Sequence, residues 1–199
     1  MAKPNQLDVR ALTGADLGHA LADVARLRIE VFRDWPYLYD GDFLYEESYL
    51  QTYRNSDRAI VVGAYDGADL VGASTGTPLA DHEDDFVTAF DGTGLAMDDV
   101  FYCAESVLLP GYRGHGAGHR FFDIREAHAR HLGFSKCCFC AVMRPENHPQ
   151  RPKQYRSLEP FWQGRAYAPL KGVVAQFSWN DVGQTTATAK PLQFWIKDL

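Results

Sequence analysis

A glycine-rich segment just past the middle of the chain has the composition of an anion-binding turn. The apolar run Val100–Leu109 is followed by a turn in which Gly114, Gly116 and Gly118 alternate with other residues, and then by a helix-like stretch at His119–Leu132. Glycine adopts positive φ angles and lets a phosphate approach the main chain closely. The amides at a helix N-terminus carry about half a positive charge. The sequence therefore predicts a strand, a turn and a helix arranged around an anion.

The spacing of these glycines excludes two common nucleotide-binding motifs. A P-loop needs Gly-Lys-Ser/Thr, which does not follow Gly118. A dinucleotide-binding motif needs an acidic residue about 20 positions after its glycines, where this chain has Cys138. The pattern that fits is Arg-x-x-Gly-x-Gly, at Arg113, Gly116 and Gly118. It resembles the pyrophosphate-binding motif of the GNAT superfamily, the CoA-dependent N-acetyltransferases. The alternative is a glycine-rich turn that binds no ligand.

Composition indicates one soluble domain over residues 1–199. The chain of 199 residues is 46% hydrophobic and 23% charged, as expected of a globular protein with one substantial core. Its formal net charge of −6 argues against a nucleic-acid partner, which calls for clustered basic residues. No apolar run approaches the ~20 residues of a membrane span, and the first six residues lack the apolar core of a secretion signal. We therefore expect a cytoplasmic protein with no membrane partner.

The spacing of cysteines and histidines does not favour a metal site. Cys137 and Cys138 are neighbours on an expected strand and so point to opposite faces, and no second pair completes a zinc site. We interpret all four cysteines as small core residues in a reducing compartment. His128 and His131 lie one turn apart near the end of a helix, where the helix dipole already favours them. Metal ligation by this pair is the weaker alternative, and no metal cofactor is expected.

Hydrophobic patterns define an order of elements. Alternating apolar residues indicate strands, and apolar residues three or four positions apart indicate helices. Strands are expected at 7–12, 59–65, 70–75, 100–109, 135–143, 173–179 and 191–197, and helices at 17–32, 42–53, 119–132 and 157–164. The polar segment 81–97 receives no assignment. This order resembles that of the GNAT fold over nearly the whole chain.

The resemblance implies a fold of the α/β (α+β) class, the GNAT acyl-CoA N-acyltransferase fold. Its mixed central sheet would have about seven strands, splayed between the fourth (100–109) and the fifth (135–143), with about four flanking helices. Acetyl-CoA would bind in the splay, where its pantetheine pairs with main-chain groups of Val107, Leu108 and Leu109. The N–H of Leu108 or Leu109 would also polarise the thioester carbonyl, an effect typically worth ~3 kcal/mol.

Further cofactor contacts follow from the same resemblance. The glycine turn would hold the pyrophosphate, and Asn147 and Trp162 would contact the cofactor from beyond the fifth strand. The residues implied to bind acetyl-CoA are Val107, Leu108, Leu109, Arg113, Gly114, His115, Gly116, Ala117, Gly118, His119, Asn147 and Trp162. Core packing is the alternative for Trp162. Arg151, Lys153 and Arg156 are either solvated charges or contacts to the adenosine 3′-phosphate.

Two residues are candidates for proton transfer. Glu105 is the acidic residue of the apolar run and stands eight positions before Arg113, where many family members have a glutamate. A carboxylate in apolar surroundings suits a general base that takes a proton from an ammonium near neutral pH. The alternative is a structural ion pair or a solvent-facing position.

The general acid of the family is usually a tyrosine, and this chain has Trp162 at that position. An indole N–H cannot serve as the acid. We predict that Tyr155 takes this role. The alternative is that the thiolate leaves unprotonated.

The segment between the first two expected helices mixes aromatic and acidic residues, and the family binds its acceptor there. Trp35, Tyr37 and Tyr39, together with Glu105, are expected to bind a small cationic, polyamine-like amine through cation–π and ionic contacts. Helix packing is the alternative for each aromatic residue. Four aromatic residues near the C-terminus belong either to the core or to a homodimer surface: Phe177, Trp179, Phe194 and Trp195.

These inferences together predict an acetyl-CoA-dependent N-acetyltransferase. It would act on the primary amine of a small-molecule acceptor by direct attack in a ternary complex. Two other hypotheses remain open. One is a catalytically silent acyl-CoA-binding sensor. The other is a nucleotide-binding α/β protein unrelated to acyl transfer, whose sheet would lack the splay.

Overall fold

The computed structural model describes residues 7–12 and 14–199. The N-terminal hexapeptide considered for a secretion signal lies outside these residues. Within them, eight strands form the sheet: β1 (Asp8–Leu12), β2 (Ile60–Asp66), β3 (Asp69–Pro78), β4 (Val100–Tyr102), β5 (Ser106–Leu108), β6 (Lys136–Val142), β7 (Ala168–Trp179) and β8 (Thr188–Asp198). The same residues contain five α-helices: α1 (Gly14–Phe32), α2 (Phe43–Asn55), α3 (Glu83–Phe90), α4 (Ala117–His131) and α5 (Glu159–Gly164).

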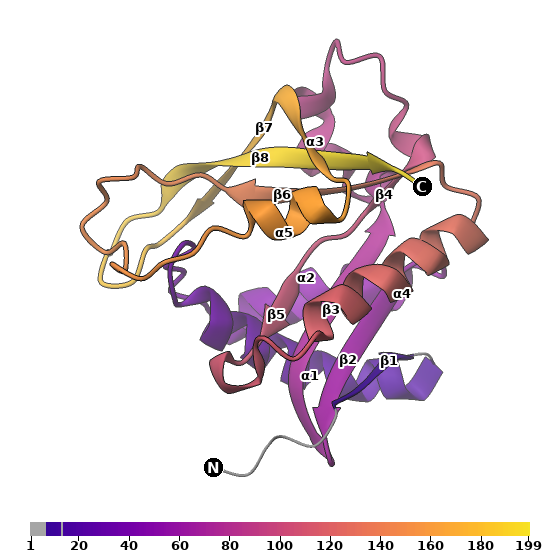
Figure 1. Ribbon diagram of the computed structural model, residues 1–199, viewed down its shortest axis with the longest axis horizontal. Coiled ribbons are helices and arrows are strands. Elements are labelled where there is room, and N and C mark those ends of the chain that lie inside the picture. Colours follow the sequence, from indigo (N-terminus) through magenta and orange to yellow (C-terminus); the bar gives the residue numbers. More distant parts are fainter. Residues whose placement is uncertain (1–6, 13) are drawn as a thin grey trace.

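The strands form one mixed sheet in the order β1-β2-β3-β4-β6-β8-β7, with β5 beside β3 and off this path. β4 and β6 run parallel, and the other strand pairs run antiparallel. Figure 1 shows α4 crossing one face of β2 and β3, with α1 and α2 on the opposite face. α5 lies beside the half of the sheet made by β6 and β8. The mixed α/β class predicted from the sequence is confirmed.

The strand expected at 100–109 is broken in the middle, and the break separates the two halves of the sheet. β4 pairs with β6, and the Cys103 N–H still donates to the Cys138 carbonyl (2.8 Å). The next two residues, Ala104 and Glu105, both pair with Thr75. The Ala104 N–H donates to the Thr75 carbonyl, and the Thr75 N–H donates to the Glu105 carbonyl (both 3.1 Å). This extra residue turns the chain, so that β5 pairs with β3 and leaves β6. The predicted splay is therefore present.

The numbers of elements differ slightly from the expected ones, for two physical reasons. Residues 103–105 interrupt one expected strand, which becomes β4 and β5. The segment 81–97, left unassigned because of its polarity, contains α3, which packs Phe86 and Phe90 into the core. Apolar residues spaced four apart were the available signal there, and the acidic residues around them obscured it.

The aromatic residues of the C-terminal strands lie in the core. Phe194 and Trp195 are buried, while Phe177 and Trp179 are half-buried against the cluster that α3 and β6 complete. These four residues therefore take the first of their two alternatives, that of core packing. The four cysteines are likewise buried, free thiols. Among the described residues, no group of three or more His, Cys, Asp or Glu side chains is placed to hold a metal. No described helix has the length and apolarity needed to cross a bilayer.

Arg125 on α4 holds the break in place from inside the molecule. Its side chain is almost fully buried, at 1% exposure. One terminal nitrogen donates to the carbonyls of Thr75 (3.0 Å) and Glu105 (2.9 Å), the other donates to Ser106 Oγ (2.8 Å), and Nε donates to the Phe121 carbonyl (3.2 Å). A single guanidinium thus ties α4 to β3, to the break and to the first residue of β5.

We expect Arg125→Met to lower the free energy of unfolding by about 3 kcal/mol, because four hydrogen bonds from a buried guanidinium are lost and the carbonyls of Thr75 and Glu105 each keep only a main-chain donor. Urea denaturation followed by tryptophan fluorescence measures the change. Arg130→Met is the matched control: its half-exposed side chain lies 3.8 Å from Glu126, and its loss should cost no more than about 0.5 kcal/mol. Equal losses in the two variants would contradict the role assigned to Arg125.

Candidate active site

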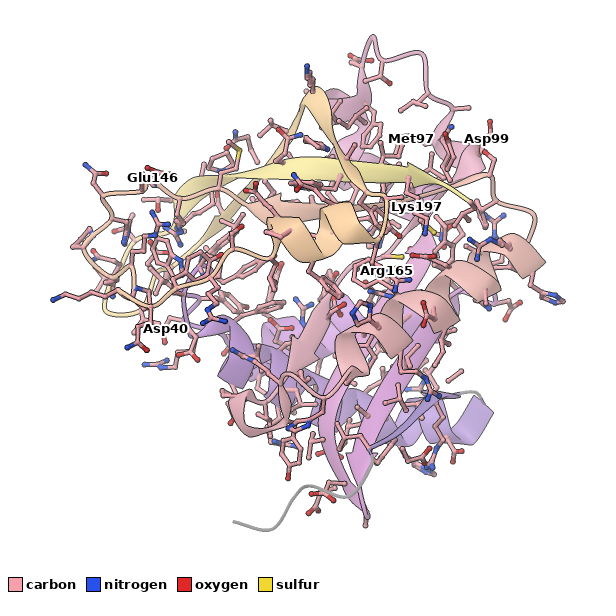
Figure 2. The ribbon with its side chains drawn as sticks, viewed as in Figure 1. Asp40, Met97, Asp99, Glu146, Arg165 and Lys197 are labelled. Atoms are coloured by element: carbon pink, nitrogen blue, oxygen red, sulfur yellow. The ribbon has the colours of Figure 1, made fainter. Side chains whose placement is uncertain are left out.

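A cleft of about 1220 Å³ lies where β5 and β6 diverge. Its wall includes the strand break, the glycine turn, β6, α5 and parts of the segments 31–37 and 144–158. Arg144 joins three segments at one end: it donates to both carboxylate oxygens of Asp181 (2.7 and 2.9 Å) and to the Pro36 carbonyl (2.9 Å). Figure 2 shows Glu146 on the segment after β6, above Asp40 on the segment between α1 and α2.

The glycine turn has the conformation of an anion site. Gly114 and Gly116 have φ angles of 84° and 85°, and Gly116 caps α4. Along the chain from the turn into α4, the first main-chain amide that donates a hydrogen bond is that of Arg120, to the Gly116 carbonyl (3.2 Å). Within the described chain, the amides from Gly114 to His119 donate to none of the protein's own oxygens. These amides are therefore free for an external anion.

The turn residues named from the sequence divide into two groups. Those that line the cleft are Arg113, Gly114, Gly116, Gly118 and His119. Ala117 is buried in the core, so that only its amide can face a ligand. His115 is exposed and lies outside the cleft wall. The positive φ angles, rather than the side chains, make this turn a site.

The main-chain amides of β5 face β3 and the cleft alternately. The Leu109 N–H donates to the Val71 carbonyl (3.0 Å), so the expectation that this amide is free is wrong. Hydrogen-bonded and non-bonded positions alternate along an antiparallel pair. Val107, two residues earlier and opposite Ala73, therefore also faces β3, and Leu108 between them faces away. Leu108 lines the cleft, and its carbonyl accepts from Arg113 Nε (3.0 Å).

Glu105 is a buried carboxylate on the cleft wall. Its side chain is 5% exposed, and Oε2 is 2.6 Å from Arg28 Nη1 and accepts from the Tyr49 hydroxyl (3.3 Å). Its other oxygen, Oε1, is buried and has no partner among the described residues. Arg28 Nε also binds Glu46, which α2 buries completely. Unlike Glu105, Glu46 lies outside the cleft wall.

Electrostatics keep the buried Arg28 charged. Burial disfavours the charge on Arg28, but the carboxylates of Glu105 and Glu46 outweigh this effect and hold its pKa well above the usual value. Burial, and then the Glu105 charge, raise the pKa values of Tyr49 and Tyr53, so both phenols stay neutral. The sequence did not single out Arg28, Glu46 or Tyr49, because each lies at an ordinary helical position. A basic residue in the apolar stripe of α1 was the only available signal.

Tyr155, predicted to be the general acid, and Trp162, predicted to contact the cofactor, both line the cleft. Tyr155 lines it and is half-buried, with its ring 5.9 Å from that of Trp35. Burial raises the pKa of Tyr155, against a smaller opposing effect of Arg151. Trp162 lines the cleft and also packs on Phe139 (5.0 Å between ring centroids), so the packing alternative is present and the cofactor contact stays a prediction.

Not every residue named beyond β6 reaches the cleft. Asn147 is exposed and lies outside the cleft wall. Of the three basic residues considered for the 3′-phosphate, Arg151 and Arg156 line the cleft and Lys153 does not.

Two of the three aromatic residues that we expect to bind the acceptor line the cleft. Trp35 and Tyr37 line the cleft, and the buried Nε1 of Trp35 has no partner among the described residues. Tyr39 does not line the cleft. Its ring packs edge-on against Trp179 (6.5 Å), and its main chain bridges to Asp181. Tyr39 therefore has the packing role that was its alternative.

Comparison with known proteins places the chain among acetyltransferases. Residues 24–152 match the model of the acetyltransferase (GNAT) family. No curated protein matches the chain in sequence.

Solved structures share the fold at low identity. YncA from Salmonella typhimurium, solved with its cofactor acetyl-CoA, is 14% identical with a TM-score of 0.58, over 98% of this chain and 95% of that one. A ribosomal-protein-alanine N-acetyltransferase from Brucella melitensis is 15% identical (TM-score 0.60; 97% and 100% covered). A polyamine N-acetyltransferase from Drosophila melanogaster is 11% identical (TM-score 0.61; 96% and 100% covered). At these identities the likeness concerns the fold alone.

We expect Gly116→Val to weaken CoA binding at least about tenfold, because a β-branched residue disfavours the left-handed conformation that aims the amides. Isothermal titration calorimetry with CoA measures the loss. Gly92→Val is the matched control: Gly92 has a φ of 72° and equally open surroundings, but it lies outside the cleft wall. Unchanged CoA affinity in Gly116→Val would refute the assignment of the turn.

Proposed function

Because the chain belongs to the GNAT family of acetyltransferases, we propose that it transfers the acetyl group of acetyl-CoA to the primary amine of a small cationic acceptor. The observation that supports a cationic acceptor is the pairing of the Glu105 carboxylate. One of its oxygens is bound by Arg28, and the other is buried beside the cleft without a partner. A buried carboxylate oxygen without a donor is costly. An ammonium group would supply that donor.

The glycine turn and β5 fit the cofactor. The free amides of residues 114–119 and the side chain of Arg113 suit a diphosphate, and Leu108 presents the main-chain groups that suit an amide-rich pantetheine arm. When bound, acetyl-CoA supplies the acetyl thioester. The Leu108 N–H is then the donor that would stabilise charge developing on the carbonyl oxygen. Trp162 would pack along the arm.

The acceptor would enter between Glu105 and the aromatic residues of the segment after α1. Trp35 and Tyr37 offer ring faces for a cation, and Trp35 Nε1 offers a donor for an oxygen of the acceptor. Glu105 would take a proton from the ammonium, which makes the nitrogen a nucleophile. Tyr155, whose raised pKa keeps it protonated at neutral pH, would give a proton to the departing sulfur.

Direct attack, without an acyl-enzyme, is the proposed route. Cys140 borders the cleft, but burial raises the pKa of its thiol to about 12. Cys103 also borders the cleft, and a hydrogen bond with Cys137 lowers its pKa. Its side chain is nevertheless 1% exposed and packed in the core with Phe121. Burial is therefore the argument against a covalent route through Cys103.

We also propose that the protein works in the cytoplasm, because its four cysteines are free thiols, as in reducing compartments. The homodimer stays a prediction.

Acetylation of a library of primary amines, followed by release of free thiol, tests the activity. The library includes agmatine, since the structurally similar Drosophila enzyme forms N-acetylagmatine. Glu105→Gln should lower kcat by about 100-fold, the usual contribution of a general base, with CoA affinity unchanged.

Glu47→Gln, a change at an exposed residue of α2, is the control and should retain full turnover. Tight CoA binding with no turnover on any amine would favour the silent sensor. Acetylated enzyme in intact-mass spectra after incubation with acetyl-CoA alone would contradict direct attack.

Tyr155→Phe tests the proton donor. Because burial raises the pKa of Tyr155 above that of an ordinary tyrosine, its acid form is present throughout the neutral range and is lost only in strongly alkaline solution. We expect kcat to fall about tenfold or more at pH 7.5, and the alkaline decline of the wild-type pH–rate profile to disappear. A profile identical to that of the wild type would mean that the thiolate leaves unprotonated.

A further inference from the structure

The buried cluster beneath the cleft contains one more carboxylate than the proposed chemistry uses. We propose that Glu46 is a positioning residue, which shares Arg28 with Glu105 and thereby keeps Glu105 able to accept a proton. Glu46 touches neither the cleft nor any reacting atom. The inference rests on the proposed role of Glu105, although its central measurement does not require turnover.

The geometry of the sharing is explicit. Arg28 lies on α1 and is nearly buried, and its guanidinium is forked between two carboxylates. Nη1 is 2.6 Å from Glu105 Oε2, and Nε binds Glu46 Oε2. The Tyr49 ring lies under the same guanidinium, 4.3 Å from centroid to Cζ, and fixes its plane. Arg28 therefore cannot turn towards one carboxylate without leaving the other.

The surroundings of Glu105 explain why a second carboxylate is needed. The titratable groups that face Glu105 are Arg28 from α1, Tyr37 from the segment after it, Glu46, Tyr49 and Tyr53 from α2, and Arg125 from α4. Burial keeps the three phenols neutral. Two guanidinium groups thus lie close to Glu105, one on its carboxylate and one on its main-chain carbonyl.

Without Glu46, both positive charges would act on Glu105 alone. A nearby cation stabilises the carboxylate form and so weakens a base. Glu46 binds Arg28 on the side away from Glu105, so that the positive charge of Arg28 is shared between the two carboxylates. The Tyr49 hydroxyl acts in the opposite direction, since its hydrogen bond to Oε2 stabilises the carboxylate. The two neighbours on α2 are therefore expected to have opposite effects.

The test is a pH titration of the Glu105 carboxyl carbon by NMR on the full chain labelled with ¹³C-glutamate, the signal being identified by its absence in Glu105→Gln. In Glu46→Gln the signal should titrate about one pH unit lower than in the wild type. In Tyr49→Phe it should titrate higher by about half a unit. Glu47→Gln on the exposed face of α2 should shift it by less than about 0.2 units, since exposed charges are screened.

An unchanged or higher midpoint in Glu46→Gln would overturn the proposal. If Glu46→Gln does not fold, Glu46→Asp is measured instead. Its shorter side chain withdraws from Arg28, so that a smaller downward shift is expected and no shift overturns the proposal. With an amine substrate, the acidic limb of the kcat/KM profile should move with the NMR midpoint. Shifted titrations in a protein that acetylates no amine would refute the proposed function and leave the sharing of Arg28 intact.

Discussion

The break in the main chain at Ala104 and Glu105 is the constraint on which the rest of the structure depends. Two residues there face the single residue Thr75, and the extra residue turns β5 away from β6. The same turn opens the cleft and brings Glu105 to its wall. Arg125 is a second donor to the carbonyl oxygens of Thr75 and Glu105, the two residues that pair across the break. Fold and site thus have one local cause, so a substitution that straightened the strand would remove both.

Three charged side chains are buried together, and hydrogen bonds offset part of the free energy that this burial costs. Arg28, Glu46 and Glu105 are removed from water, where isolated ions would cost several kcal/mol each. Their mutual contacts, with Tyr49, offset part of this cost. Two buried carboxylate oxygens have no hydrogen-bond partner among the described residues, Glu46 Oε1 and, at the cleft, Glu105 Oε1. Such incomplete pairing is unusual in a core that serves stability alone. It is what a binding site for a cation needs.

The sequence was sufficient for features that depend on local pattern. The glycine spacing predicted the turn before α4, and alternating apolar residues predicted most strands. An acidic residue in an apolar run indicated Glu105. Features that depend on contacts distant in sequence were not accessible: the Leu109 amide is used by Val71, and Tyr39 packs against Trp179. Arg28 and Glu46 form the buried cluster with Glu105 only because α1 and α2 pack together in the fold. Single-sequence patterns carry no information on such pairs.

The divergence of β5 from β6 leaves two strand borders facing each other inside one molecule. Open borders of this kind commonly recruit strands from other chains and seed aggregates. Here residues of α4, of α5 and of the segment after β6 line the cleft between these two borders. A ligand bound in the cleft would cover both borders and stabilise the folded state by mass action. The stability of the protein would then depend on the concentration of that ligand in the cell.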